Sequence, residues 1–148
     1  MTLPFEVGVV VRDLELMERF YCDVLGCRAG HRSRVPESIG GPAGLGGELV
    51  VVWLDVPSGG RVKLILPRSS PVAAPVPAVP TGRLGLSYLT FHLDDMDPVV
   101  AELRAVGARP LSEPAVVPAR GRRISFWGDP EGNVVELVDE RGPTRPGA

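Results

Sequence analysis

The sequence predicts an α+β fold made of two similar modules, and three observations support this prediction. Each half of the chain reads as a strand, a helix and then two or three strands. A proline-rich stretch, residues 67–83, separates the halves. The 148 residues are 44% apolar and 23% charged, which is ordinary for one domain or two small modules. We therefore expect modules over residues 1–66 and 84–140, with a flexible tail at 141–148.

The first half begins with an apolar, β-branched run, residues 5–12, which predicts a buried strand. Asp13 suits a helix N-cap, apolar residues then recur on one helical face, and Gly26 is typical of a helix end. Two strands and a hairpin turn are expected next, at 49–56, 62–66 and Ser58-Gly59-Gly60. The Gly-rich segment 40–47 resembles a flexible lid, because no phosphate-loop lysine follows it.

The second half repeats this order. Residues 88–93 predict a strand, and Asp97-Pro98 fits a helix N-cap followed by proline at the first helical position. Apolar residues mark one face of the helix, which is expected to stop at Gly107. Two closing strands and the turn between them are expected at 124–127, 133–138 and 128–132.

Composition narrows the classes of function. The net charge of −2 provides no basic surface for nucleic acid, and no apolar run approaches the length of a membrane span. The N-terminus lacks the basic start and apolar stretch of a signal peptide. Cys22 and Cys27 have no nearby histidine partners, so we interpret them as reduced thiols rather than a zinc site or a disulfide. These features favour a cytoplasmic protein with no nucleic-acid or membrane partner.

Two motifs resemble those of a known family. R-F-Y-C-D-V-L-G-C, residues 19–27, is similar to the opening of a vicinal oxygen chelate module, and G-D-P-E-G-N-V-V-E-L-V, residues 128–138, to the end of one. This superfamily contains glyoxalases, bleomycin resistance proteins and extradiol dioxygenases. The resemblance covers residues 5–139 and implies two βαβββ modules whose curved mixed sheet encloses an open cup. Related proteins often form dimers, so the resemblance also implies a possible homodimer, which the sequence itself leaves open.

Metalloenzymes of this superfamily hold a divalent metal at the cup floor, with ligands from the first and last strands of each module. Carried over to this chain, the four floor positions are Glu6, Ile65, Tyr88 and Glu136. Ile65 has no ligand atom, and a neutral tyrosine is a poor ligand for a hard divalent ion. The resemblance therefore implies an incomplete metal set, with either no cofactor or a divalent metal held weakly by Glu6 and Glu136.

The two floor carboxylates have three uses that the sequence leaves open. Glu6 and Glu136 could hold a metal with water ligands, could act as a general acid and base, or could be paired with Arg or Tyr without chemistry. Tyr88 either donates a hydrogen bond to the substrate or fills the space of a missing metal. Glu6, Glu136 and Tyr88 are thus the candidate catalytic residues.

Strand alternation assigns neighbours of these residues to the same floor. The candidate substrate-binding residues are Lys63, Ile65, Thr90, His92 and Trp53. For His92 the alternative is a hydrogen bond to a turn, and for Trp53 and Trp127 it is core packing. His31 is interpreted as a solvated strand edge. The run Arg120, Arg122 and Arg123 either attracts an anionic ligand or forms a solvated edge.

Two functions follow from this pattern. The sequence favours a small-molecule lyase or isomerase that uses the floor carboxylates for acid/base chemistry on an oxygenated substrate. The alternative is a protein that binds and sequesters an aromatic or cationic small molecule, as antibiotic-resistance members of the superfamily do. A purely structural module fits poorly, because carboxylates on an apolar floor are costly unless they are used or paired.

Overall fold

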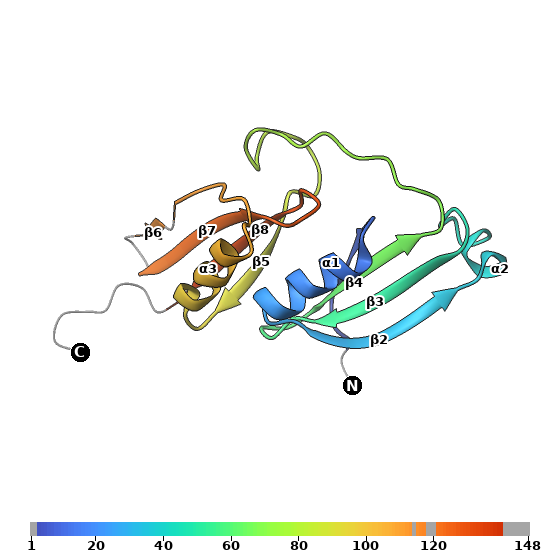
Figure 1. Ribbon diagram of the computed structural model, residues 1–148, viewed down its shortest axis with the longest axis horizontal. Coiled ribbons are helices and arrows are strands. Elements are labelled where there is room, and N and C mark those ends of the chain that lie inside the picture. The colour runs from blue at the N-terminus through green and yellow to red at the C-terminus, as the bar shows by residue number, and fades with distance from the viewer. Residues whose placement is uncertain (1–2, 114, 118–120, 141–148) are drawn as a thin grey trace. The chain divides into compact units, whose positions relative to one another are not determined.

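The computed structural model describes residues 3–113, 115–117 and 121–140. The chain divides into two compact units, Met1–Ala74 and Pro75–Ala148, and we describe each by itself (Figure 1). The division falls within residues 67–83, where the sequence predicts a linker. The open cup stays a prediction. The predicted tail at 141–148 lies outside the described residues.

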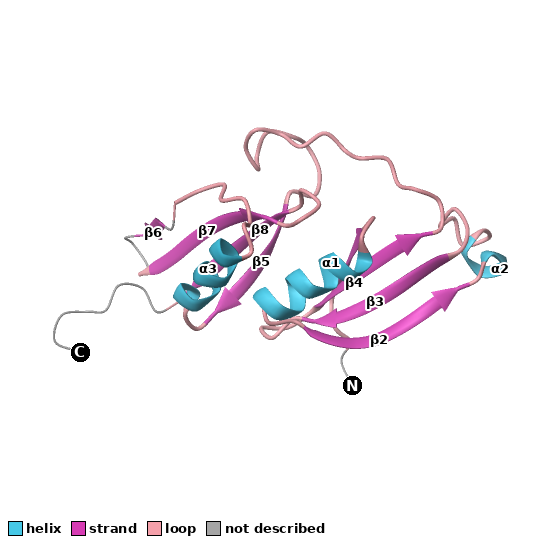
Figure 2. Ribbon diagram, in the orientation of Figure 1, coloured by secondary structure: helices cyan, strands magenta, loops and turns pink. Residues whose placement is uncertain are grey.

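The first unit is a four-stranded sheet with the strand order β1-β4-β3-β2. β1 runs parallel to β4, and the other neighbours are antiparallel. Helix α1 packs against β4 on one face of this sheet (Figure 2). The elements are β1 (Glu6–Val10), α1 (Leu14–Arg19), the π-helical turn η1 (Phe20–Val24), β2 (Arg28–Val35), α2 (Glu37–Gly40), β3 (Leu49–Asp55) and β4 (Arg61–Pro67).

The helical region of the first unit starts where the sequence predicts. Asp13 is the N-cap, and its carboxylate accepts a hydrogen bond from the Leu16 amide at 3.0 Å. Gly26, at a φ of 78°, reverses the chain after η1, in a conformation that disfavours other residues. The Gly-rich segment folds into α2 and a series of turns, and a Cβ at Gly40 would overlap the carbonyl of Gly47.

The second unit has the corresponding strand order, β5-β8-β7-β6, and again the first strand is parallel to the last. Its elements are β5 (Tyr88–Leu93), α3 (Met96–Ala105), β6 (Ala115–Val117), β7 (Arg122–Gly128) and β8 (Val134–Asp139). With two sheets and few helices, the structure confirms the predicted α+β class.

The start of α3 corrects the sequence prediction. The N-cap is Asp95, whose carboxylate accepts from the Asp97 amide at 3.0 Å, and not Asp97 itself. The reason is Met96, which is fully buried and is the first residue of the helix, two residues before the start that an Asp97 cap would give. Pro98 then lies in the first turn, where its missing N–H costs no intrahelical hydrogen bond.

Each unit buries the apolar face of its sheet under a helix. In the first unit the fully buried side chains include Met17, Leu54 and Leu64, and in the second Phe91 and Leu137. Trp127 belongs to the second core: it is 1% exposed, and its indole N–H donates to the Ser125 hydroxyl at 2.7 Å. Core packing, rather than a pocket wall, is therefore its role. Among the described residues, no helix has the length and apolarity needed to cross a membrane.

Candidate functional site

The candidate residues lie on the sheet face that points away from the buried core, which we call the floor face of each unit. On β4, Lys63 and Ile65 alternate with the buried Val62 and Leu64, so they point to the floor face. On β8, Glu136 alternates in the same way with the fully buried Val135 and Leu137. The alternation that the sequence predicts is present on β4, whereas on β8 Val134 and Val138, on the same face as Glu136, are buried as well.

The strand register changes one assignment. Asp13 and Asp95 each cap the first helix of their unit. Glu6 and Tyr88 lie the same number of residues before these caps, so they occupy matching positions in the two units. Two residues beyond Tyr88, Thr90 lies opposite Glu136.

Two residues beyond Glu6, Gly8 lies opposite Lys63. The residue that corresponds to Glu136 is therefore Lys63, where the sequence alone pointed to Ile65. Ile65 lies one row further along, opposite Val10. Alternation fixes the face of a strand residue but not its register, which explains the difference.

The corrected floor positions do not fit a four-ligand metal centre. They are Glu6, Lys63, Tyr88 and Glu136, and Lys63 carries an ammonium group that repels a divalent cation. Tyr88 carries a neutral phenol, a poor ligand for such ions. Only two of the four side chains have the donor chemistry of a glyoxalase-type centre. Over residues 3–113, 115–117 and 121–140, the structure shows no cluster of three or more His, Cys, Asp or Glu that could hold a metal.

Among the residues that the structure describes, Glu136 is bonded to one neutral side chain. The Thr90 hydroxyl donates to its Oε1 atom at 2.9 Å, and the carboxylate has no ion pair within the described part of the chain. Phe126 lies opposite Glu136 on β7, and its ring meets Tyr88 edge-on with centroids 5.1 Å apart. Glu136 is half-buried, while Tyr88 is 44% exposed. A carboxylate in this setting keeps lone pairs for a ligand.

Glu6 is exposed at the start of β1, opposite Arg61. Arg61 is already occupied, because its Nε donates to Asp55 at 2.8 Å. Within the described residues Glu6 therefore has no cationic partner. Glu6 and Glu136 belong to different units, and their joint action stays a prediction.

His92 lies at the far end of the same floor face as Glu136. It sits opposite Val138, and its Nδ1 is 3.7 Å from the Glu140 carboxylate. Arg122 donates from Nε to the second oxygen of Glu140 at 3.1 Å. His92 thus lies beside the carboxylate of Glu140, in the turn that follows β8, at a distance longer than a hydrogen bond.

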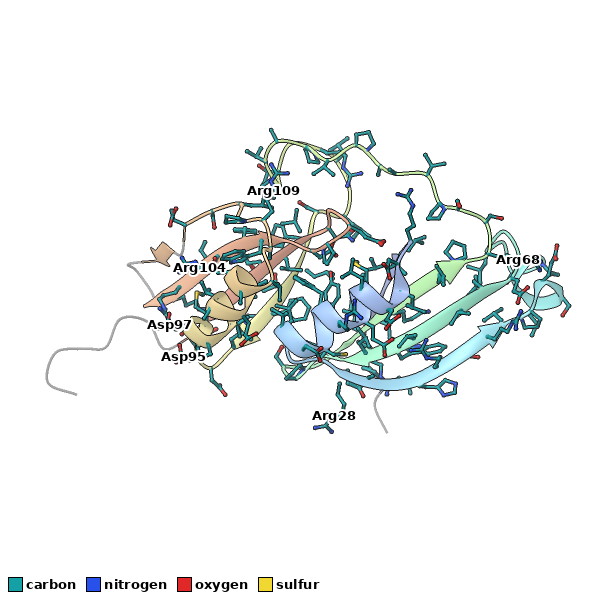
Figure 3. The ribbon with its side chains drawn as sticks, viewed as in Figure 1. Arg28, Arg68, Asp95, Asp97, Arg104 and Arg109 are labelled. Atoms are coloured by element: carbon teal, nitrogen blue, oxygen red, sulfur yellow. The ribbon has the colours of Figure 1, made fainter. Side chains whose placement is uncertain are left out.

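The expected basic patch is not formed by Arg122 and Arg123, because they point to opposite faces of β7. Arg123 reaches under the sheet to the fully buried Asp139 and to the start of α3, where Figure 3 shows Asp95 and Asp97. The hydrogen bond with Asp139 raises the pKa of Arg123 most, although burial opposes it. This arginine is structural. Arg120 lies outside the described residues.

Trp53 lies on the floor face of the first unit, whereas the sequence left both a pocket wall and core packing open for it. It is half-exposed, and its register partner on β4 is Lys63. The ring of His31 packs beside it, with centroids 5.3 Å apart and planes tilted by 36°.

The sequence did not indicate two residues of the floor faces, His31 and Phe126. His31 reaches Trp53 through an irregularity of register between Ala29 and Arg32, which has no clear sequence signal. Strand alternation could have assigned Phe126 to the floor face, since the next residue, Trp127, is buried on the opposite face.

Comparison with known proteins identifies the family. Residues 5–126 match the family model of the Glyoxalase/Bleomycin resistance protein/Dioxygenase superfamily, and the chain belongs to this superfamily. The predicted membership is confirmed.

Several relatives align along nearly the whole chain. The uncharacterized protein YaeR of Escherichia coli (strain K12) is 26% identical over 90% of this chain and 93% of its own. A glyoxalase family protein from Bacillus cereus is also 26% identical, with a TM-score of 0.79 and 93% of each chain covered. A trypanothione-dependent glyoxalase I of Leishmania major shares the fold at 19% identity, with a TM-score of 0.67 over 95% of this chain and 88% of that one.

Proposed function

We propose that the protein is a small-molecule lyase or isomerase in which Glu136 transfers a proton. The observation that carries this proposal is the state of Glu136: a half-buried carboxylate, bonded to Thr90 and without a cationic partner among the described residues. An arginine partner would occupy the carboxylate oxygens, whereas here the Thr90 hydroxyl orients the carboxylate and leaves oxygen lone pairs to accept a substrate proton. Phe126 lies opposite Glu136 on β7, and its ring meets that of Tyr88 edge-on.

The chemistry fits a substrate with an acidic C–H bond next to a carbonyl group. Glu136 removes that proton, and the electron pair of the C–H bond moves to the carbonyl oxygen, giving an enolate. Tyr88 is two residues from Thr90 on the same face of β5, so its phenol is a candidate donor to the enolate oxygen. Where the carbon that loses the proton carries a hydroxyl group, that hydroxyl's proton moves to the enolate oxygen, and Glu136 returns the first proton to the former carbonyl carbon, which completes an isomerisation. Where the β carbon carries a leaving group, its departure with the C–X electron pair completes a lyase reaction.

Glu6 is proposed as a second proton-transfer residue, on the floor face of the first unit. Its support is that Arg61, the cation opposite it, is engaged by Asp55. Glu6→Gln tests this role separately, and a loss of turnover without a loss of folding is the expected result.

Hydrogen–deuterium exchange at carbon tests the proposal without knowledge of the natural substrate. Small hydroxyketones and 2-oxo acids are incubated with the protein in D2O, and loss of the C–H signal is followed by NMR. We expect Glu136→Gln to slow exchange by about 100-fold or more, the contribution of a general base. Glu102→Gln, on the exposed face of α3, is the matched control. Exchange that is unchanged in Glu136→Gln would refute the proton-transfer role.

A binding protein is the second candidate, and the aromatic rings on both floor faces favour it. Trp53 with His31, and Tyr88 with Phe126, supply flat apolar surfaces that a ligand could cover. Such a protein needs no free base. In that case Glu136→Gln would leave ligand affinity within about 1 kcal/mol, the net value of one ordinary hydrogen bond.

Metal content is a separate test, since a divalent metal held weakly by Glu6 and Glu136 is the alternative to a metal-free site. The floor positions include Lys63 and Tyr88, so we expect well below one metal per chain after purification without chelators or a metal-affinity tag. Elemental mass spectrometry measures it. Stoichiometric metal that disappears in Glu136→Gln would instead show that this carboxylate is a ligand.

A further inference from the structure

We infer that the floor face of the first unit binds planar aromatic carboxylates, with Trp53 and His31 as the flat surface and Lys63 as the cation. This inference goes beyond the proposed function and does not depend on it, because it uses neither Glu136, which lies in the other unit, nor Glu6.

The aromatic part of the site is a half-exposed indole with a second ring beside it. Trp53 is on β3, an interior strand of its sheet, while Trp127 is 1% exposed and packed in a core. The two tryptophans of the chain thus differ sharply in environment. The imidazole of His31 lies 5.3 Å from the Trp53 ring, where the irregularity in β2 places it. Tilted rings of this kind offer a planar ligand two contact surfaces.

The charged part of the site is Lys63, which lies opposite Trp53 in the antiparallel register. The carboxylate on the neighbouring row of β3 is Asp55, and it is engaged by Arg61 at 2.8 Å. Within the described residues, no carboxylate lies within ion-pair distance of the Lys63 ammonium. An unpaired ammonium beside an exposed indole favours an anionic ligand over a cationic one.

The neighbouring rows of side chains define how a ligand would lie. On one side of Lys63 and Trp53 is the Arg61–Asp55 ion pair, and on the other is the apolar pair Ile65 and Val51. On β1, Gly8 lies opposite Lys63 and adds no side chain, although Ile65 leans over it: a Cβ at Gly8 would lie 3.1 Å from Ile65 Cδ1. This surface suits a molecule with one anionic end and a flat apolar body.

NMR titration with three matched probes tests the inference, read out on the indole N–H signals of Trp53 and Trp127. Benzoate has both the ring and the charge, benzamide lacks the charge, and cyclohexanecarboxylate lacks the planar ring. We expect benzoate to shift the Trp53 signal and leave that of the buried Trp127 unchanged. Benzamide and cyclohexanecarboxylate are expected to bind at least about tenfold more weakly.

Variants of Lys63 test the charged part of the site. Lys63→Met should weaken benzoate binding at least about tenfold, while Lys63→Arg keeps it within about threefold, because the charge is retained. Arg28→Met is the matched control and should have no effect, because Arg28 is an exposed cation at the first residue of β2 in the same unit (Figure 3). Glu136→Gln should also bind benzoate normally. A loss of proton exchange in that variant therefore tests only the proposed function.

Three results would overturn the inference: a Trp53 signal that benzoate does not move, equal affinities for benzoate and benzamide, or normal benzoate binding by Lys63→Met. A Trp53 indole signal that shifts with protein concentration and does not shift when benzoate is added would mean that a second copy of the chain covers this face. Light scattering on the same samples identifies that outcome, which also refutes the ligand site.

Discussion

Burial sets the chemistry of the two cysteines in the first unit. Both are free thiols, as the sequence predicts, and Cys27 is buried. Burial, with a smaller contribution from Cys22, raises the pKa of the Cys27 thiol to about 12. Burial followed by the charge of Glu18 also raises the pKa of Cys22, although this side chain is less enclosed. Neither thiol is poised as a nucleophile, because the thiolate is the reactive form.

The raised pKa of Cys27 predicts a loss of stability in alkali. Below the usual thiol pKa the group is protonated in both folded and unfolded chains and has no effect. Between that value and about 12 the unfolded chain releases the proton while the folded chain retains it, so stability falls as pH rises. Thermal unfolding of the wild type between pH 8 and 11 should therefore show a steeper decline than that of Cys27→Ala. Parallel curves would contradict the raised pKa.

At the scale of residues, the sequence predicts which face of a strand a side chain lies on better than it predicts which side chains it contacts. The alternation of β8 correctly predicts that Glu136 points away from the core, because one face of that strand is almost entirely apolar. It could not predict that Thr90 would be the hydrogen-bond partner of Glu136, or that Lys63 would take the matching position in the first unit. Both depend on the register between strands that are distant in the sequence.

At the scale of elements, a buried ion pair joins α3 to its sheet. The Asp139 carboxylate is fully buried, accepts from the Met96 amide at 2.8 Å at the start of α3, and pairs with Arg123. Arg123 also pairs with Asp97 on the helix at 2.8 Å. The arginine thus links β7, β8 and the first turn of α3, and it neutralises a charge that would otherwise be costly to bury.

Neighbouring arginines on β7 provide a matched pair of variants. Arg123→Met leaves Asp139 buried without its cation and should destabilise the protein by about 3 kcal/mol. Arg122→Met removes only an exposed contact with Glu140 and should cost less than about 1 kcal/mol. Chemical denaturation measures both changes. Equal losses in the two variants would show that Arg123 does not support α3.

The N-cap of α3 shows why the sequence locates elements better than their ends. Asp95 and Asp97 are both good caps, and proline after Asp97 favours the second of them. The decision is made by tertiary contacts: Met96 enters the core, and its amide binds Asp139, a residue far along the chain. The irregularity of β2 that brings His31 to Trp53 likewise depends on pairing with β3.

At the scale of the whole molecule, the proline-rich segment is the natural place to separate the two units. The units meet in sequence between Ala74 and Pro75, and no helix or strand is found over residues 68–87. Side chains that a compact unit would bury are exposed there, with Val72 at 95%, Leu84 at 96% and Leu86 at 86%. A protease that needs extended, accessible chain should therefore act in this segment before it acts in either sheet.

Limited proteolysis with thermolysin, which cuts before apolar residues, tests this division. We expect the first cuts next to Val72, Leu84 or Leu86, giving two fragments that each contain one complete sheet and resist further digestion. Mass spectrometry identifies the cut sites, and a urea-unfolded sample shows which bonds the protease accepts in the free chain. First cuts within β3 or β8 would contradict two separately stable units, because those interior strands can be cleaved only after their own sheet has opened.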